Sequence, residues 1–493
     1  MIFIYIVCFL LLFYYLLTKN YGYWESKNVP FEKPVFVFGS FYKIVTKQQH
    51  LFYRIREIYN NFKTPYCGIY IFNRPNLVIR DPQLIKKVLV KDFDKFMNHP
   101  FASNEKVDPL TYHSLLGSQD QVWKNLRGKL SPVFTSGKMK LMLPLMKECA
   151  SDLAVCVEKH RGDKIEIREI MKKYAVDIIS SCAFGINSYC LKNDKSEIME
   201  VATKLADFKS FVRNFSVFSF IFMPKFVDIF RLTFLDKSAS NYLIDVFNNT
   251  LREREKKGIL RNDLIDLLNN LKHNEAFNEN YKFDDLKMAA QAVQFFSAGN
   301  ETTSLTLAFT MYELAINKDV QYRLRQEVKE TFNKYGDFTY EAIQEMTYLD
   351  MVLNETLRKY PLTSFLDRKC ENTYTFEDTE LTLDRNVSIL IPVAGLHHYD
   401  PEYFPDPEKF DPERFSLENR HKIVPYTFLP FGDGPRSCIG QRFAILVGKV
   451  ALAYCLKDFA FDVANNTKVP LELDNGVAFI MNKGDLYLNV TKL

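Results

Sequence analysis

The sequence lacks the cysteine spacings that mark disulfide scaffolds and zinc sites. Its nine cysteines are an odd number scattered over 493 residues, and no CxxC pair occurs among them. These features exclude a disulfide framework and a zinc site, and they favour a reduced environment that faces the cytosol.

The chain also lacks a strong excess of charge of either sign. It has 64 basic and 60 acidic residues, so its formal net charge is only +4. This balance excludes nucleic-acid binding driven by bulk charge, and any electrostatic partner must meet a local patch. No internal repeat, low-complexity tract or clear linker divides the chain, which favours one continuous domain behind its N-terminal segment.

That N-terminal segment differs from the rest of the chain. Residues 2–17 are sixteen consecutive apolar or aromatic residues, and Thr18 and Lys19 end the run. No basic residues precede the run and no small-residue cleavage site follows it, which disfavours a removed signal peptide. We predict an uncleaved membrane anchor at residues 1–18, a connector at 19–34 and one large globular domain at 35–493. The lysines after the anchor place that domain on the cytoplasmic side.

The domain is predicted to be mainly helical, of the α+β class. A helix is expected at residues 50–62, followed by a hairpin of strands at 66–72 and 77–80. Helical periodicity dominates from residue 121 onward, with little strand signal until about residue 380.

A cysteine loop at residues 431–440 precedes an apolar helical pattern at 439–456. Cys438 therefore lies at a helix N-terminus, where the helix dipole and free N–H groups favour a thiolate. Arg436 adds a second positive influence. The loop alone leaves three roles open for this sulfur, namely nucleophile, redox thiol or metal ligand.

Three further motifs carry donors, acids and hydroxyl groups at helical spacing. Trp123 and Arg127 share one helix face and suit a carboxylate, although a solvated amphipathic helix is the alternative. In residues 298–303, Thr302 can bond back to the carbonyl of Ala298 and bend the helix beside Glu301, or the bend has no chemical role. The third motif pairs Glu355 with Arg358 at i, i+3 spacing.

The cysteine loop resembles the haem-ligand loop of the cytochrome P-450 superfamily of haem-thiolate monooxygenases. The five matching positions are Phe431, Gly434, Arg436, Cys438 and Gly440. The resemblance covers nearly the whole chain. Residues 123–138 and 395–407 resemble microsomal insect members that metabolise foreign compounds.

The resemblance implies the cytochrome P-450 fold, a large helical domain with a smaller β-rich N-terminal part, and a b-type haem bound through Cys438 and Phe431. It implies that the haem propionates contact Trp123, Arg127, Arg368 and Arg436. It assigns proton delivery to Glu301 and Thr302, and a buried structural cluster to Glu355, Arg358 and Arg414. It places in the substrate pocket Phe295, Ala298, Thr302, Ser364, Phe365 and Ile480. Asn300 and Leu362 depart from the pattern of many relatives.

The function implied by the resemblance is monooxygenation at the endoplasmic reticulum membrane. One oxygen atom of O2 enters a hydrophobic small molecule, with electrons from NADPH through a flavoprotein reductase; cytochrome b5 is a second candidate partner. This implies a role in the metabolism of foreign compounds or of endogenous lipids and hormones. Two alternatives stay open: an oxygen-independent isomerase or dehydratase, and a non-catalytic haem or ligand carrier.

Two surfaces are predicted for partners. The exposed members of a basic set near the haem motifs would dock the reductase, and this set is Lys124, Arg127, Lys129, Arg436, Arg442 and Lys449. Residues 208–234 contain nine phenylalanines and only five charged residues. We expect this segment to form a substrate-entry lid that dips into the bilayer, with ordinary core packing as the alternative.

Overall fold

The structure is a computed structural model that describes residues 1–193, 195–207, 210–273, 283–398, 400–475 and 479–493. Helices make up 56% of it, which confirms the predicted mainly helical class. Its helices are α1 Ile2–Thr18, α2 Tyr23–Ser26, α3 Tyr42–Val45, α4 Leu51–Asn61, α5 Pro82–Lys86, α6 Pro109–His113, α7 Asp120–Leu130, α8 Ser136–Glu158, α9 Ile167–Phe184, α10 Glu197–Leu205, α11 Phe211–Phe222, α12 Pro224–Phe230, α13 Lys237–Lys257, α14 Leu264–His273, α15 Asp285–Ile316, α16 Lys318–Tyr335, α17 Tyr340–Glu345, α18 Thr347–Lys359, α19 Val393–His398 and α20 Gln441–Asp458.

The strands are short and form small sheets. They are β1 Tyr66–Ile71, β2 Arg74–Ile79, β3 Lys164–Glu166, β4 Leu366–Lys369, β5 Tyr374–Phe376, β6 Leu381–Leu383, β7 Ser388–Ile391, β8 Phe459–Val463 and β9 Tyr487–Lys492. The largest described sheet has the order β1-β2-β7-β4 and is antiparallel except where β2 pairs with β7. The predicted hairpin is confirmed as β1 and β2, whereas β3, β4 and β5 lie in the stretch where little strand was expected.

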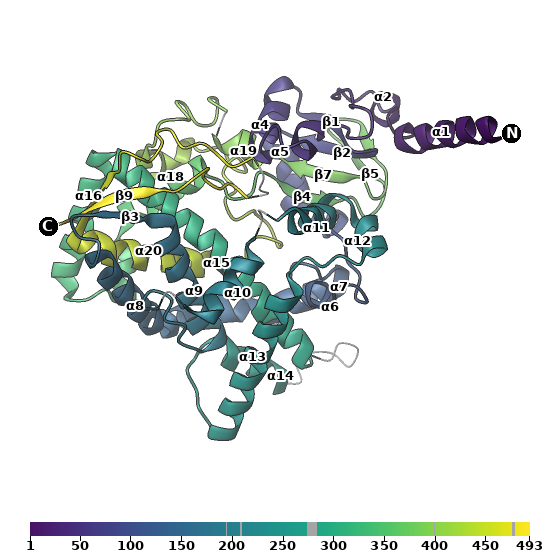
Figure 1. Cartoon of the computed structure of the whole chain (residues 1–493). Helices are drawn as coiled ribbons and strands as arrows, with labels where there is room; N and C mark the ends of the chain where they lie inside the picture. Colours follow the sequence, from purple (N-terminus) through teal and green to yellow (C-terminus); the bar gives the residue numbers. More distant parts are fainter. Residues whose placement is uncertain (194, 208–209, 274–282, 399, 476–478) are drawn as a thin grey trace.

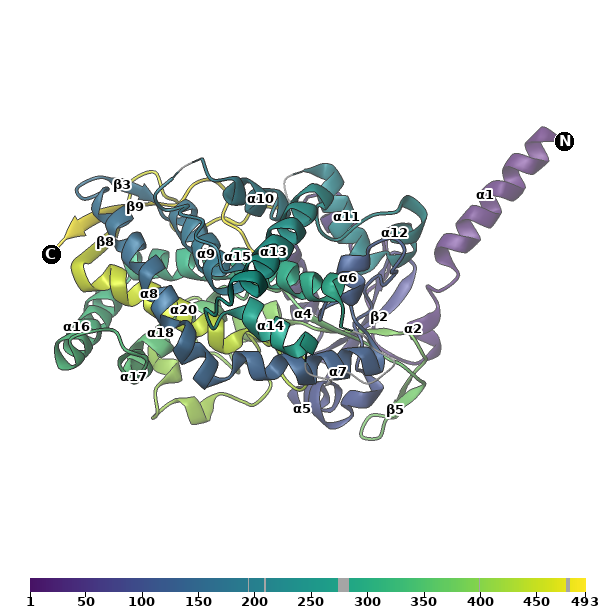
Figure 2. The same cartoon turned by 90° about the horizontal axis from the view of Figure 1, so that it is seen from below.

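Helix α15 runs through the centre of the helical part of the molecule (Figures 1 and 2). Its 32 residues are buried over most of their length, because apolar side chains occur on nearly every face. Asp284 caps its N-terminus by accepting a hydrogen bond from the N–H of Lys287. Helix α9 packs along α15, and α18 and α20 also contact it. The predicted site is built around this helix.

A buried ionic cluster ties α18 to the chain that leads toward the cysteine loop. Arg358 donates two hydrogen bonds to Glu355, over 2.7 and 2.9 Å, and a third to the carbonyl of Pro407 over 2.8 Å. Arg414 Nε lies 3.4 Å from Glu355 Oε1. The side chains of Glu355 and Arg358 are fully buried, so each charge depends on the other for compensation.

Helix α1 projects away from the body, and its large apolar side chains are exposed (Figures 1 and 2). Across the described residues, the structure contains no helix with both the length and the apolar character needed to cross a membrane. The anchor at residues 1–18, the connector at 19–34 and the domain at 35–493 stay predictions.

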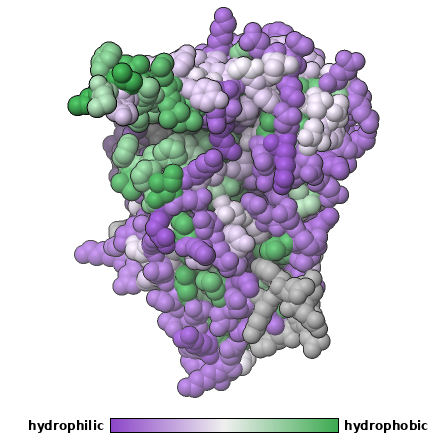
Figure 3. Space-filling model, turned by 90° about the vertical axis from the view of Figure 1, so that its right-hand side faces the viewer, coloured by the Kyte–Doolittle hydropathy of each residue, from purple (hydrophilic) through white to green (hydrophobic). Residues whose placement is uncertain are grey.

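The phenylalanine-rich segment folds into α11 and α12, while Phe208 lies outside the described residues. Its side chains divide into two groups. Phe220 and Phe222 are buried, whereas Phe211 and Phe230 are 73% and 57% exposed. Figure 3 views the molecule from the side on which α1 projects, and it shows apolar side chains gathered at α1 and on the same face of the body. Core packing therefore accounts for only part of this segment.

Candidate active site

The cysteine loop is held in a tight turn before α20. The N–H of Cys438 donates to the carbonyl of Phe431 over 2.8 Å, and the N–H of Ser437 donates to that of Gly434 over 3.0 Å. Gly434 has a φ of +73°, and a Cβ there would lie 1.9 Å from the carbonyl oxygen of Leu89. Only glycine fits this close approach of two backbones.

Cys438 lies on the wall of a cavity of about 390 Å³. Burial raises the pKa of its thiol, while the N–H groups of Gly440 and Gln441 and the charge of Arg127 act in the opposite direction. A coordinated metal deprotonates a thiol outright, so this sulfur binds as the thiolate once a metal ion is present. The surroundings then offer N–H donors and a cation to the sulfur anion.

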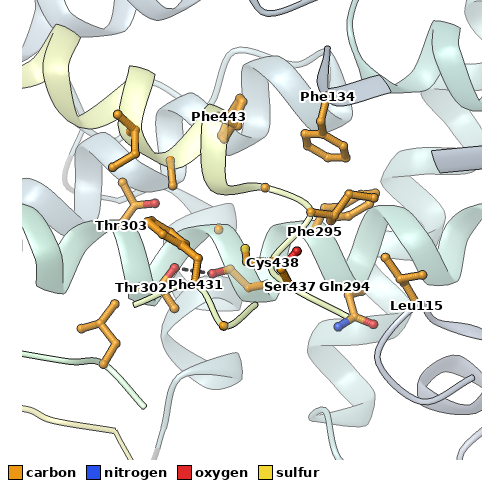
Figure 4. A pocket seen from close by; sticks show the side chains of 18 of the residues that line it. Leu115, Phe134, Gln294, Phe295, Thr302, Thr303, Phe431, Ser437, Cys438 and Phe443 are labelled. Atoms are coloured by element: carbon orange, nitrogen blue, oxygen red, sulfur yellow. Dashed lines mark hydrogen bonds between the residues drawn. The ribbon is translucent and has the colours of Figure 1, made fainter. Parts of the chain in front are cut away.

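The cavity is bounded by the cysteine loop on one side and by α15 on the other (Figure 4). Most of its lining is apolar or aromatic, as a hydrophobic guest requires. The sequence-predicted residues that line it are Trp123, Arg127, Phe295, Ala298, Thr302, Phe431, Arg436 and Cys438.

Three arginines meet at one end of this site. Arg436 stacks on the ring of Trp123 at 4.3 Å, and Arg127 donates to the carbonyl of Ser437 over 2.8 Å. Burial, together with the charges of Arg368 and Arg127, lowers the pKa of Arg436 to about 9. Burial likewise lowers the pKa of Arg368 to about 10, and its Nε has no hydrogen-bond partner. Clustered cations with an unused donor suit an anionic ligand that carries carboxylates.

Thr302 and Glu301 point in different directions. The Thr302 hydroxyl faces the cavity and donates to the carbonyl of Ala298 over 2.6 Å, the back-bond that the sequence predicted. Glu301 does not line the cavity. Its Oε1 lies 3.3 Å from Arg168 on α9, and its Oε2 is buried without a hydrogen-bond partner.

Some residues expected in the substrate pocket lie elsewhere. Phe365 and Ile480 pack with Phe222 of α11 in a separate apolar cluster, and Ser364 is buried without lining the cavity. Family position alone does not show how α11 fills the space beside these residues. Conversely, His99 and Gln294 line the cavity and were not anticipated, because neither belongs to a local sequence motif.

The predicted basic docking set divides in a similar way. Lys124 and Arg442 are exposed and Lys129 is half-buried. Lys449 is buried and contacts Asp350 at 2.8 Å, while Arg436 belongs to the arginine cluster. Lys449 is therefore not available to a partner protein, and the half-buried Arg127 and Arg436 already donate hydrogen bonds within the site.

Comparison with known proteins identifies the family. The profile of the family described as Cytochrome P450 matches residues 29–490. The chain belongs to the cytochrome P450 family. It is 39% identical to cytochrome P450 6k1 of Blattella germanica, over 96% of this chain and 93% of the relative. It is 36% identical to cytochrome P450 6j1 of the same species, with 97% and 95% covered, and 37% identical to cytochrome P450 6A1 of Musca domestica, again with 97% and 95% covered.

The chain is therefore a haem-thiolate monooxygenase, and its cofactor is a haem with a thiolate ligand. The site fits this group on two observations. A cysteine sulfur with N–H donors faces a largely apolar cavity. The arginine cluster beside it includes a buried donor without a partner, Arg368 Nε, which suits the carboxylates of a haem.

The two left-handed glycines of the loop give a matched pair of variants. Gly434→Ala is expected to displace the loop, because the added methyl group would lie 1.9 Å from the carbonyl oxygen of Leu89. Gly432 has a similar φ of +69°, but the atoms nearest to an added methyl group there would lie 3.8 Å away. Gly432→Ala should cost only about 1 kcal/mol of backbone strain. We expect Gly434→Ala to lose most of its bound haem and its thiolate-type carbon-monoxide Soret band, and Gly432→Ala to keep both. Equal haem content in both variants would contradict this account of the loop.

Proposed function

We propose that this enzyme binds b-type haem through Cys438 and inserts one oxygen atom from O2 into a hydrophobic small molecule. The observation that carries this proposal is the shared cavity, in which the Cys438 sulfur and the Thr302 hydroxyl face the same largely apolar space. We further propose that Trp123, Arg127, Arg368 and Arg436 hold the haem carboxylates, and that Phe431 packs against the haem. The substrates are foreign compounds or endogenous lipids and hormones.

The chain's own groups have distinct tasks in this proposal. When bound, the haem supplies the iron that activates dioxygen, and a thiolate ligand favours O–O cleavage. The loop holds the Cys438 sulfur in place, and the apolar walls exclude bulk water from the substrate. Thr302 holds a proton at Oγ1, which its bond to Ala298 orients. The carboxylate of Glu301 points away from the cavity toward α9, where Arg168 stabilises its charge.

The intact hydroxyl favours monooxygenation over the two other functions considered. An oxygen-independent isomerase needs no proton donor beside bound oxygen, and a ligand carrier needs no donor at all. In this chain the cavity exposes the hydroxyl of Thr302 on α15, and the neighbouring acid, Glu301, is paired with Arg168. Oxygen labelling distinguishes monooxygenation from both alternatives.

Oxygen labelling tests the reaction class. With 18O2, NADPH and a flavoprotein reductase, wild-type product is expected to carry one labelled atom per turnover. Thr302→Ala should lower product formed per NADPH about tenfold or more, because proton transfer by a positioned group contributes roughly 10²–10⁴-fold. Thr306→Ala is the matched control, since Thr306 lies one turn further along the cavity and makes the same type of back-bond over 2.9 Å. Unlabelled product with unchanged turnover would favour the isomerase.

We propose that a flavoprotein reductase docks beside the cysteine loop, and that cytochrome b5 uses the same face. The exposed Lys124 and Arg442 and the half-buried Lys129 support this, together with a hollow of about 310 Å³ at Phe431 and Gln441. An acidic partner would meet a local patch even though the net charge is small.

Ionic strength tests the docking face. Raising the salt concentration from about 0.05 to 0.5 M should weaken reductase binding, because exposed charges are screened within about 10 Å at 0.1 M. The double variant Lys124→Gln, Arg442→Gln should reduce both the affinity and its salt dependence. Lys140→Gln, Lys334→Gln replaces exposed lysines that neither line this hollow nor belong to the predicted basic set, and it should leave both unchanged. A salt-independent affinity in the wild type would rule out the proposed surface.

We propose that the protein is held at the endoplasmic reticulum membrane with its catalytic domain facing the cytoplasm. Two exposed apolar elements support attachment: α1, and the outer face of α11 and α12. Both lie on the face seen in Figure 3. Apolar side chains on one face of a protein suit insertion into the headgroup region of a bilayer.

Vesicle binding separates the two elements. Removing residues 2–18 should weaken binding, and adding Phe211→Ser and Phe230→Ser should weaken it by a further tenfold or more, because burying a phenylalanine contributes about 1.5–3 kcal/mol. Leu141→Ser and Val155→Ser on α8 are the control, since these side chains are also exposed but occur on another helix. If the phenylalanine and control pairs weakened binding equally, α11 and α12 would have no specific role at the membrane.

A further inference from the structure

Two glutamines of α15 hold the segment that leads into α7. Gln291 Oε1 accepts a hydrogen bond from the N–H of Leu115 over 3.0 Å, and Gln294 Oε1 accepts one from the N–H of Leu116 over 3.3 Å. Only the oxygen of a side-chain amide accepts such a bond, so these contacts fix which end of each amide carries the NH2 group. The surroundings of the two NH2 groups can therefore be compared directly.

The NH2 group of Gln291 is used inside the protein. It donates to the carbonyl of His113 over 2.7 Å and to that of Lys287 over 3.1 Å, and the whole side chain is buried. Gln291 does not line the cavity. Its amide therefore has a structural task, which is to join α15 to the end of α6.

The NH2 group of Gln294 has no such task. Gln294 is half-buried and lines the cavity, and no hydrogen-bond partner for its Nε2 occurs among the described residues. In the view of Figure 4 the amide nitrogen is turned toward the cysteine loop and the amide oxygen toward Leu115. The neighbouring lining residues Leu115, Leu116 and Phe295 are apolar. A fixed hydrogen-bond donor thus stands in an otherwise apolar part of the wall.

We propose that Gln294 is a specificity-determining residue, and that its NH2 group donates a hydrogen bond to a carbonyl or ether oxygen of a hydrophobic substrate. This inference rests on the proposed oxidation of a hydrophobic molecule in this cavity, and it narrows the class of that molecule. The bond between Gln294 Oε1 and the N–H of Leu116 orients the amide before a substrate arrives. A donor that is already oriented loses little side-chain entropy on binding.

The surroundings of this donor favour a neutral acceptor over a carboxylate. A single uncharged N–H group does not compensate an anion that is withdrawn from water among apolar side chains. A carbonyl or ether oxygen is uncharged and is satisfied by one donor. A hydrocarbon of the same shape would cover the NH2 group of Gln294 and leave it without a partner, so it should bind less tightly.

Matched ligand pairs test this inference by equilibrium dialysis against the holoenzyme. The two members of a pair differ only in an acceptor group that a CH2 group replaces: benzophenone with diphenylmethane, and dibenzyl ether with 1,3-diphenylpropane. The measured quantity is the ratio of the two affinities within each pair, in which any change that affects both ligands equally cancels. Gln294→Met keeps the length of the side chain but has no N–H donor, so it should lower both ratios about fivefold to tenfold.

Gln291→Met is the matched control. It also removes the acceptor of one N–H in the segment before α7, but the amide of Gln291 does not face the cavity, so both ratios should keep their wild-type values. An equal fall in the two variants would mean that movement of this segment causes the effect, and the role of Gln294 would be wrong. Unchanged ratios in Gln294→Met, or no binding of either oxygen-containing ligand by the wild type, would overturn it as well.

A second measurement needs no variant and tests the charge of the acceptor. The wild type should bind methyl laurate about tenfold or more tightly than laurate, because the cavity wall around Gln294 offers no compensation for an anion. Tighter binding of laurate would overturn the assignment of a neutral acceptor.

Dialysis requires neither electrons nor O2, so its outcome is separate from that of oxygen labelling. Unlabelled product together with ratios that fall in Gln294→Met would overturn the proposed monooxygenation and leave the donor site standing. Labelled product together with unchanged ratios would overturn only the role of Gln294. Circular dichroism and the carbon-monoxide spectrum establish that each variant is folded.

Discussion

The withdrawal of three guanidinium groups from water beside one cavity, complete for Arg368 and partial for Arg127 and Arg436, is the constraint on which the site depends. Buried cations are costly unless their donors are used. Arg436 donates to the carbonyls of Met97 and Ser118 over 2.9 and 2.8 Å, and Arg127 donates to that of Ser437 over 2.8 Å. These bonds join the segment before α7, α7 itself and the cysteine loop. These arginines therefore hold the cysteine loop in place, so that Cys438 lies on the cavity wall opposite α15.

Carbonyl oxygens satisfy donors but do not cancel charge. Asp367 is close enough to raise the pKa of Arg368 and Arg436, and Asp120 also acts on Arg436, yet burial still lowers both pKa values. An anionic guest would supply the missing compensation, and its binding would strengthen each hydrogen bond by making it charge-assisted. The same residues that join the walls of the site thus favour a ligand with carboxylates. Cofactor binding and rigidity of the thiolate loop are two consequences of one arrangement.

Local features of this arrangement were predictable from sequence. The caps at Asp81 and Asp284, the β1–β2 hairpin and the helix after Cys438 depend on neighbouring residues, and all occur in the structure. The shared helix face of Trp123 and Arg127 follows from the helical repeat.

Features that depend on distant parts of the chain were not predictable. His99 contacts Asp367 across 268 positions of sequence, and neither residue has a local signal for the other. Lys449 looked like a surface charge but is buried against Asp350, because α18 and α20 pack together. Phe365 and Ile480 were predicted to line the substrate pocket from their family position alone. Their actual surroundings depend on how α11 packs. Long-range packing decides which polar side chains are exposed, and a single sequence carries little information about it.

Glu301 and Thr302 show why adjacency in a motif does not mean adjacency in a site. Successive residues of a helix point about 100° apart. Thr302 accordingly faces the cavity, while Glu301 contacts Arg168 on α9. No hydrogen bond joins their side chains in the described part of the chain. A proton passing from the acid to the hydroxyl therefore needs a rotation of Glu301 or a bridging water. Because the ion pair with Arg168 must weaken before Glu301 rotates, α9 influences proton supply to a cavity that it only partly lines.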